Sequence, residues 1–280
     1  MKIDSWIFEA HDDMKHGYKV KNILFLEQSK YQEVAVLETE GYGKALYLDG
    51  LLMLTEKHEF FYHDVIVHPA LFIHPEPRNV LIIGGGDGGS LREVLKHPSV
   101  QHVDMVEIDE MVVEVSKKFF PTLNTEFNNP KANVMFKDGI KYVAETSAKY
   151  DIIIVDSSDP IGPAEGLFNK TFYENAEKIL NSDGIITSQI ESPLFYAEFF
   201  KQHFSITKKI FPIAMPMIGF EPDYPYGMWG YSFLSKKYHP LNDFSEEKVS
   251  RSNIKTNYYN PEVHKALFAY PNFVKDLLSE

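Results

Sequence analysis

The sequence lacks cysteine, long apolar runs and an excess of positive charge. Without cysteine, disulfides, thiolate nucleophiles and cysteine-ligated zinc sites are excluded. No apolar stretch approaches the roughly 20 residues that a membrane-spanning helix requires. The first residues, Met1–Trp6, contain no apolar segment typical of a signal peptide. We therefore expect a cytoplasmic protein without a membrane partner.

The net charge is −12 over 280 residues. Because neutralising phosphates requires a basic face, this charge predicts no nucleic-acid partner. An acidic cleft raises the local concentration of cations, so the charge is compatible with a polycationic substrate. A solvated acidic surface explains the same number equally well.

The order of elements predicts an α/β protein with two unequal parts. Partial alternation and turn signals such as Asp49-Gly50 indicate a small antiparallel β domain in residues 1–55. A helix is expected over 56–73. Beyond it, apolar strands alternate with helices, which is typical of a doubly wound parallel sheet in a domain of residues 56–280. The predicted strands are 79–84, 102–108, 133–137, 151–156, 184–190, 211–218 and 228–236, the last two as an antiparallel edge pair, and the predicted helices are 90–97, 109–119, 139–147, 170–181, 194–209 and 261–270.

A glycine-rich loop follows the first apolar strand of the larger part. Val80–Ile83 has the composition of a strand buried on both faces, and Gly84–Gly89 follows it as Gly-Gly-Gly-Asp-Gly-Gly. Three of these glycines fit the dinucleotide-binding spacing, which is weak evidence alone. Asp87 changes the interpretation, because a phosphate-binding loop presents backbone amides and excludes an anion. The expected ligand is therefore a cation rather than a pyrophosphate.

Acidic residues follow four successive strands at the edge where doubly wound sheets bind their ligands. They are Asp87, Glu107, Asp138, Asp156 and Asp159. Glu107 is placed to accept the ribose hydroxyls of a nucleoside. Asp138 is placed to accept from an exocyclic amine of the base. The remaining acids would surround a site rich in positive charge.

A sulfonium nucleoside with an amine tail, meeting a second amine, satisfies this arrangement. An alkylammonium has a pKa near ~10.4, so at neutral pH its lone pair is occupied. One carboxylate must accept that proton while others hold the far end of the substrate. Such chemistry requires no metal or other cofactor. The histidines in and beside the 56–73 helix also miss helical-neighbour spacing, so no metal site is expected; they are His58, His63, His68 and His74.

Several motifs of this chain resemble those of the spermidine synthases, the polyamine aminopropyltransferases, over essentially its whole length. The shared segments are Gly84–Gly89, Arg92–His97, Glu107–Asp109, Asp156–Ala164, Tyr31-Gln32, Tyr62-His63 and Tyr258-Tyr259. The resemblance implies a transferase with a small N-terminal β domain on a Rossmann-like, methyltransferase-type core. It also implies a homodimer or homotetramer.

The resemblance further implies transfer of the aminopropyl group of decarboxylated S-adenosylmethionine to putrescine, giving spermidine and methylthioadenosine. Asp156 would be the base that deprotonates the attacking amine. By position, the residues expected to bind the donor or methylthioadenosine are Gln32, His63, Asp87, Glu107, Asp138, Gly139 and Pro163, and those expected to bind the amine are Tyr62, Asp156, Asp159, Gln189 and Tyr224.

The chain departs from the family pattern beside the expected amine channel. Residues 220–227 are Phe-Glu-Pro-Asp-Tyr-Pro-Tyr-Gly, where many members have Ile-Pro-Thr-Tyr-Pro-Ser-Gly. Glu191, Glu221 and Asp223 are thus additional acids there. They either favour a longer or more charged acceptor or are simply solvated.

Other functions share part of the pattern. Another amine, such as cadaverine, agmatine or spermidine, is an alternative acceptor. A methyltransferase using intact S-adenosylmethionine would place the methionine carboxylate against Asp87, where it would be repelled. An NAD-dependent oxidoreductase predicts a glycine loop free of carboxylate. A nucleoside-binding module without catalysis would not need both Asp156 and Asp159.

Overall fold

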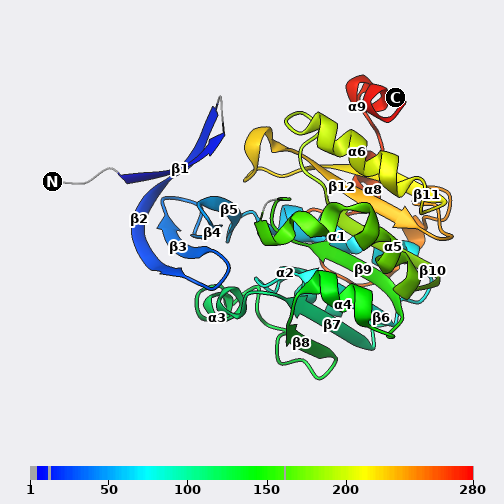
Figure 1. Ribbon diagram of the computed structural model, residues 1–280, viewed down its shortest axis with the longest axis horizontal. Helices are drawn as coiled ribbons and strands as arrows, with labels where there is room; N and C mark the ends of the chain where they lie inside the picture. Colours follow the sequence, from blue (N-terminus) through cyan, green and yellow to red (C-terminus); the bar gives the residue numbers. More distant parts are fainter. Residues whose placement is uncertain (1–4, 12–13, 161, 280) are drawn as a thin grey trace.

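The computed structural model describes residues 5–11, 14–160 and 162–279, without the side chains of residues 10, 11, 163 and 226. These residues form two β-sheets, with helices packed around the larger one (Figure 1). The smaller sheet is antiparallel, with its strands in chain order: β1 (Ser5–His11), β2 (Met14–Gln28), β3 (Glu33–Thr39), β4 (Lys44–Leu48) and β5 (Leu51–Thr55).

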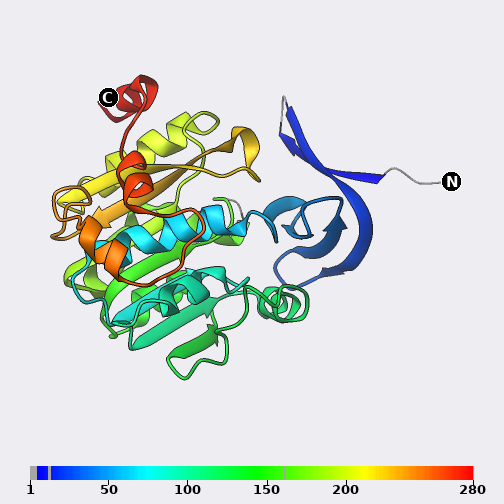
Figure 2. The same cartoon turned by 180° about the vertical axis from the view of Figure 1, so that it is seen from behind.

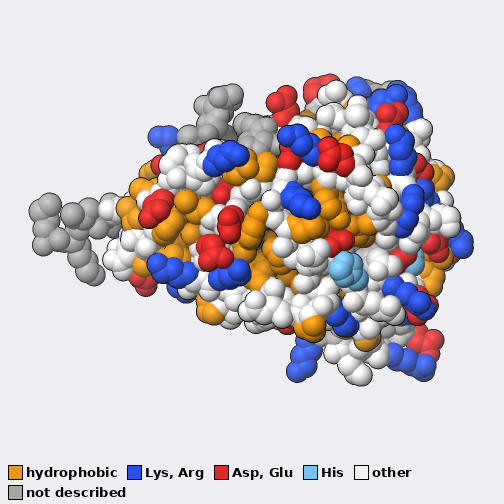
Figure 3. Space-filling model, turned by 60° about the horizontal axis from the view of Figure 1, so that its bottom comes forward, with side chains coloured by type: hydrophobic (Ala, Val, Ile, Leu, Met, Phe, Trp, Pro, Cys, Tyr) orange, Lys and Arg blue, Asp and Glu red, His pale blue; other side chains and the backbone are white. Residues whose placement is uncertain are grey.

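The N-terminal sheet projects from the rest of the molecule, but its inner part packs on the core. Val34, Val36 and Leu46 form one apolar cluster with Val112 and Val115 of α3 (Glu110–Phe119). The outer strands β1 and β2 instead expose large apolar side chains, namely Trp6, Phe8, Ile23 and Leu26. Figure 3 shows apolar side chains gathered over the part of one face toward the N-terminal end. The antiparallel sheet is confirmed, and the domain limits of 1–55 and 56–280 stay a prediction.

The larger sheet has the order β11-β12-β10-β9-β6-β7-β8. The five strands from β10 to β8 are parallel, and β12 and β11 run antiparallel at one edge, as predicted. Strand order reverses between β6 and β9, so a crevice is expected at their carboxyl ends. The bounds are β6 (Asn79–Gly84), β7 (His102–Glu107), β8 (Ala132–Phe136), β9 (Tyr150–Asp156), β10 (Leu180–Gln189), β11 (Ile213–Phe220) and β12 (Met228–Ser235).

Helices cover both faces of this sheet, which confirms the doubly wound α/β architecture. One face carries α1 (Glu59–Ile73), α2 (Gly89–Leu95), α7 (Glu246–Arg251) and α8 (Pro261–Ala266), seen in front in Figure 2. The other carries α4 (Gly139–Glu145), the 3₁₀ helix η1 (Gly162–Phe168), α5 (Lys170–Ile179) and α6 (Ala197–Thr207), seen in front in Figure 1. A short 3₁₀ turn, η2 (Pro225–Gly227), precedes β12.

The C-terminal segment is more helical than the sequence indicates. Besides α8, which falls inside the predicted 261–270 helix, it contains α7 and α9 (Asn272–Ser279). Val274 of α9 packs against Phe200 and Phe204 of α6. Among the described residues, no helix combines the length and apolarity needed to cross a membrane.

Candidate active site

A cavity opens at the carboxyl ends of β6 and β9. Its space, mouth included, is about 1090 Å³. Its walls come from the N-terminal sheet, α1, the glycine loop and the ends of β7, β8 and β9. Of the predicted donor-binding residues, Gln32, His63, Asp87, Glu107, Asp138 and Gly139 line it, together with Tyr62, Asp156 and Tyr224. The side chain of Pro163 lies outside the described residues.

The glycine loop allows β6 and β9 to approach each other at the cavity floor. Gly84 has a φ of 83°, and a Cβ there would overlap the carbonyl oxygen of Asp156. The N–H of Gly85 donates to that oxygen at 2.8 Å. A Cβ on Gly89 would overlap the ring of His63. The loop therefore requires glycine where β9 and α1 approach it at the cavity.

His63 joins two acids in a buried charge network. Its Nδ1 lies 2.7 Å from Glu59 Oε2, and its Nε2 lies 3.2 Å from Asp87 Oδ1. Arg92 donates two parallel hydrogen bonds to Glu59, at 3.0 and 2.8 Å. Burial opposes the charged ring, but Asp87 and Glu59 outweigh it and raise the pKa of His63 well above its ordinary value. Both ring nitrogens therefore act as donors.

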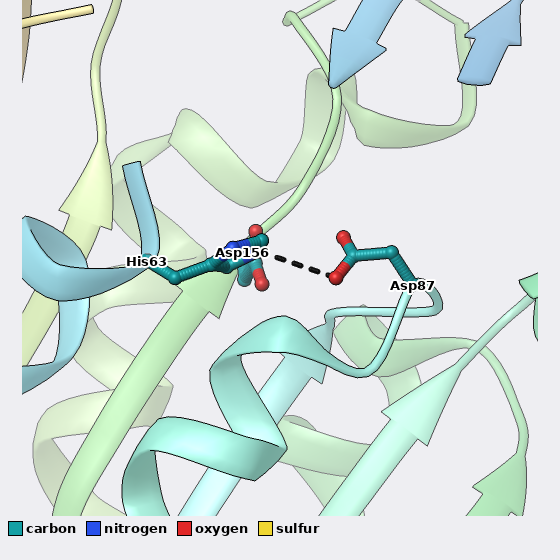
Figure 4. Close-up of side chains that lie close together, drawn as sticks. All are labelled: His63, Asp87 and Asp156. Carbon is teal, nitrogen blue, oxygen red and sulfur yellow. Dashed lines mark ion pairs between the residues drawn. The ribbon is translucent and has the colours of Figure 1, made fainter. Parts of the chain in front are cut away.

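Asp156 ends β9 and points toward His63 and Asp87 (Figure 4). Its Oδ1 accepts from the Tyr62 hydroxyl at 2.9 Å, whereas its buried Oδ2 has no hydrogen-bond partner among the described residues. Burial and the charge of Asp87 raise the pKa of Asp156 to about 6. Asp156 can thus both lose and accept a proton near neutrality, and one of its oxygens is free to bind a ligand.

The opposite end of the cavity has the groups that a nucleoside needs. Burial raises the pKa of Glu107 to about 7, even though its Oε1 accepts from the N–H of Asp109 at 2.9 Å. Asp138 caps α4 through Oδ1, which accepts from the N–H groups of Ile140 and Lys141 at 3.0 and 3.2 Å. Gly139 begins α4 beside it. The carboxyl groups of Glu107 and Asp138 and the backbone of Gly139 therefore lie together at this end of the cavity.

A second cavity adjoins the first and shares Met53, Tyr62 and Tyr224 with it. Its other walls include the predicted amine-binding residues Asp159 and Gln189. It also contains acids and an aromatic ring from separate elements, namely Glu9, Glu191 and Trp229. Gln189 is fixed there, because its Nε2 donates to the carbonyl oxygens of Ser157 and Ser158 at 3.3 and 3.2 Å.

The N-terminal sheet is tied to both cavities by hydrogen bonds. Gln32 Nε2 donates to Asp109 Oδ2 at 3.0 Å, and the Tyr224 hydroxyl donates to the carbonyl oxygen of Met53 at 2.8 Å. Gln32 is therefore held at the cavity wall by the loop after β7.

The three additional acids are buried, so the expectation that they are solvated is wrong. Asp223 accepts from the hydroxyl of Tyr18, from both the N–H and hydroxyl of Thr55, and bonds the His58 ring. Burial and the charge of Asp159 raise the pKa of Glu191 to about 10. Asp223 is removed from water by packing against the N-terminal sheet, through Tyr18 and Thr55, which local sequence does not encode.

Sequence reasoning missed two members of the network, Glu59 and Arg92. The contact of Glu59 with His63 follows the i, i+4 spacing of a helix, which was an available signal. The Arg92 contact joins α2 to α1 and depends on the tertiary fold.

A metal would find few free ligands among His63, Asp87 and Asp156, whose potential ligand atoms lie within 4.8 Å of one another. A ring whose two nitrogens both donate has no lone pair for a metal. The same ring is bound on both sides by Glu59 and Asp87. The absence of a metal requirement stays a prediction.

Comparisons with known proteins agree with this architecture. Residues 59–246 match the family model of the spermine/spermidine synthase domain, and residues 5–56 match that of the spermidine synthase tetramerisation domain. The chain is 48% identical to the polyamine aminopropyltransferase of Methanocaldococcus jannaschii, over 100% of this chain and 97% of that protein. It is 47% identical to that of Thermoanaerobacter sp. (strain X514), over 99% of this chain and 100% of that protein.

Solved structures give the same result. A spermidine synthase in complex with the transition-state analogue AdoDATO superposes with a TM-score of 0.96 and 40% identity, over 98% of this chain and 95% of that one. Spermidine synthase from Thermotoga maritima gives a TM-score of 0.95 and 39% identity, over 99% of this chain and 95% of that one. Fold and matches define a transferase with a Rossmann-like core. The chain belongs to the spermidine synthase family, the polyamine aminopropyltransferases.

Proposed function

We propose that this chain transfers the aminopropyl group of decarboxylated S-adenosylmethionine to putrescine. The observation that carries the proposal is the buried Asp156, whose free Oδ2 and pKa of about 6 suit a general base. It lines the donor-side cavity, and the adjoining cavity offers room for a second amine. Relatives named polyamine aminopropyltransferase support the reaction type.

In this reaction the amine nitrogen attacks the propyl carbon bonded to the sulfonium. A C–N bond forms, the C–S bond breaks, and its electron pair leaves on sulfur as the neutral thioether of methylthioadenosine. The proton lost by the amine goes to Asp156. Holding nitrogen, carbon and sulfur in line lowers the activation free energy further, by up to about 7–11 kcal/mol in well-oriented systems.

The donor-side residues take separate roles in the proposal. Glu107 accepts from the ribose hydroxyls, and Asp138 with Gly139 contacts adenine, with Pro163 as a wall of that pocket. Gln32, His63 and Asp87 hold the aminopropyl end.

The acceptor-side residues line the other cavity. Tyr62, Asp159, Gln189 and Tyr224 surround putrescine, and their acids and hydroxyls accept from its ammonium groups. Tyr62 also holds Asp156 in place through the 2.9 Å hydrogen bond to Oδ1.

The test supplies purified protein with either decarboxylated or intact S-adenosylmethionine as the donor. Each donor is combined in turn with putrescine, cadaverine, agmatine or spermidine. We expect spermidine and methylthioadenosine from the decarboxylated donor and putrescine, identified by mass. Faster turnover with another amine would identify that amine, rather than putrescine, as the acceptor. Turnover only with the intact donor would instead identify a methyltransferase and sink the proposal.

We also propose that the chain forms a homodimer or homotetramer through its N-terminal sheet. The match of residues 5–56 to a tetramerisation domain supports this assembly. The exposed Trp6, Phe8, Ile23 and Leu26 give the outer strands an apolar surface of the kind that marks protein interfaces. Light scattering should give a mass of two or four chains, and a mass of one chain at micromolar concentration would contradict it.

A further inference from the structure

Glu221, the first residue after β11, is a buried acid with an unused oxygen at the wall of the main cavity. Its exposed fraction is 2%. Oε1 accepts from the N–H of Asp223 at 3.3 Å, whereas Oε2 has no hydrogen-bond partner among the described residues. Buried polar groups of folded proteins are normally paired, so an orphaned carboxyl oxygen at a cavity wall indicates a ligand.

Glu221 differs from the other acids at this end of the cavity. Glu59 is held by Arg92 and His63. Asp87 Oδ1 lies 3.2 Å from His63 Nε2 and accepts from the Gly89 N–H at 2.6 Å. Those two acids already have partners, whereas Asp156 Oδ2 and Glu221 Oε2 have none among the described residues.

The position of Glu221 assigns it to the donor side. It lines the main cavity together with His63 and Asp87, and it is not among the described residues that line the second cavity. The charge of His63 lowers the pKa of Glu221 and that of Glu59 raises it, which agrees with a position toward the His63 end. The nucleoside end, with Glu107 and Asp138, lies at the other side of the same cavity.

Burial, and then the charge of Asp223, raise the pKa of Glu221 well above its ordinary value. Without a cation beside it, the neutral form of the carboxyl group is therefore favoured. An arriving cation with N–H donors satisfies the orphaned oxygen and favours loss of the proton to solvent. A ligand carboxylate would instead keep Glu221 protonated, because a second negative charge opposes its ionisation.

We infer that Glu221 binds the terminal ammonium of the aminopropyl donor beside Asp87, as a specificity-determining residue. This inference rests on the proposed function. The ammonium would thus contact two carboxyl groups. That of Asp87 is already neutralised by His63, and that of Glu221 can ionise to balance the added positive charge. The acceptor amine, in the second cavity, does not use Glu221.

The test compares two nucleosides on Glu221→Gln. Decarboxylated S-adenosylmethionine carries the ammonium, and methylthioadenosine lacks it. Gln keeps the acceptor for the Asp223 N–H but cannot become an anion. We expect the dissociation constant of the decarboxylated donor to rise roughly tenfold, while that of methylthioadenosine changes less than about twofold. At saturating donor, kcat should stay within about threefold of the wild type, so that the effect appears in KM.

Glu262→Gln, which removes one exposed carboxylate from α8, is the matched control and should alter neither affinity. Equal weakening of both nucleosides by Glu221→Gln, or no weakening of either, would overturn the inference. If the Gln variant does not fold, Glu221→Met removes the carboxyl group without burying another polar one and is tested in the same way. Affinities are measured without an acceptor, so a wild type that binds the donor but transfers nothing contradicts the proposed function and not this inference.

Discussion

Two clusters of one histidine and two acids adjoin the same helix, α1, and the first of them lines the main cavity. The first is His63, Asp87 and Asp156, and the second is Asp64, His68 and Glu93. Their residue types are nearly identical. What differs is how many of their oxygens are already bound.

In the second cluster every carboxylate is paired. Glu93 lies 3.0 Å from His68 Nε2 and 2.8 Å from Arg92 Nε, and Asp64 Oδ2 accepts from three successive N–H groups of residues 257–259. Burial opposes the ionisation of Glu93, yet His68, Arg92 and Lys96 hold its pKa well below the ordinary range. The cluster joins α1 to α2 and to the C-terminal segment.

In the cavity cluster Asp156 keeps an unpaired oxygen and a raised pKa. Arg92 links the two clusters, because it binds Glu93 of the second cluster and Glu59, which is the partner of His63 in the first. From this comparison we expect a paired buried acid to be costly to remove, because its partners lose their counter-charge, whereas an unpaired one is available for chemistry.

The largest expected effect is on catalysis. Asp156→Asn keeps an acceptor for Tyr62 but cannot take the amine proton, so we expect kcat to fall about 10²- to 10⁴-fold. The affinity for methylthioadenosine, measured by titration calorimetry, should change little. In the wild type kcat/KM should rise as pH increases through about 6, because the base must be ionised.

Asp276→Asn, which makes the same change at an exposed position of α9, is the control for this variant and should keep full activity. If Asp156→Asn kept the wild-type kcat, Asp156 would not be the base. The cavity cluster would then differ from the paired cluster in structure but not in function.

A large loss of stability is expected in the other cluster. Glu93→Gln leaves the buried His68 with only Asp64, and Arg92 with only Glu59, as a counter-charge, so the free energy of unfolding should fall by about 3–5 kcal/mol. Denaturant unfolding measures it. Glu114→Gln, which breaks an exposed pair with Lys117, should cost less than about 1 kcal/mol. If the two variants lost the same free energy of unfolding, the Glu93 cluster would contribute no more to stability than an exposed ion pair.

The two clusters should respond to pH with opposite signs. The pKa of Asp156 is raised on folding, so its favourable contribution is present below pH 4 and lost as pH rises through about 6. Asp156→Asn should therefore stabilise the protein at pH 7.5 by on the order of 1–3 kcal/mol, and not at pH 4. The pKa of Glu93 is lowered, so its contribution is present above its ordinary pKa and lost on acidification. Thermal melts at both pH values test this, and a destabilised Asp156→Asn at pH 7.5 would contradict it.

The smallest effect is expected at the rim of the second cluster. Lys96 Nζ lies 2.5 Å from Glu93 Oε2, but its side chain is one-third exposed. Lys96→Met should lower the free energy of unfolding by no more than about 1 kcal/mol, because Arg92 and His68 still neutralise Glu93. A loss as large as that of Glu93→Gln would mean that Lys96, rather than the buried groups, balances the charge.

The sequence predicted those features that depend on local order. The glycine loop and the acids at strand ends followed from Gly84–Gly89, Glu107, Asp138 and Asp156, since parallel strands bring their carboxyl ends to one edge. The short helices α7 and α9 were missed, because segments of six and eight residues span too few turns to establish a helical period.

Long-range contacts limited the prediction of the site. Nothing local indicates that Arg92 reaches Glu59, or that Asp223 is bound by Tyr18 and Thr55, residues far away in the chain. The burial of Glu191, Glu221 and Asp223 is decided by such contacts.

The second cavity has walls from widely separated parts of the chain: Glu9 on β1, Asp159 after β9 and Trp229 on β12. Its length and polarity can consequently change by substitutions in the first strand or the last, with Asp156 and the nucleoside end left as they are. If the proposed function holds, selection or engineering can therefore retune the acceptor while the reacting centre is inherited unaltered.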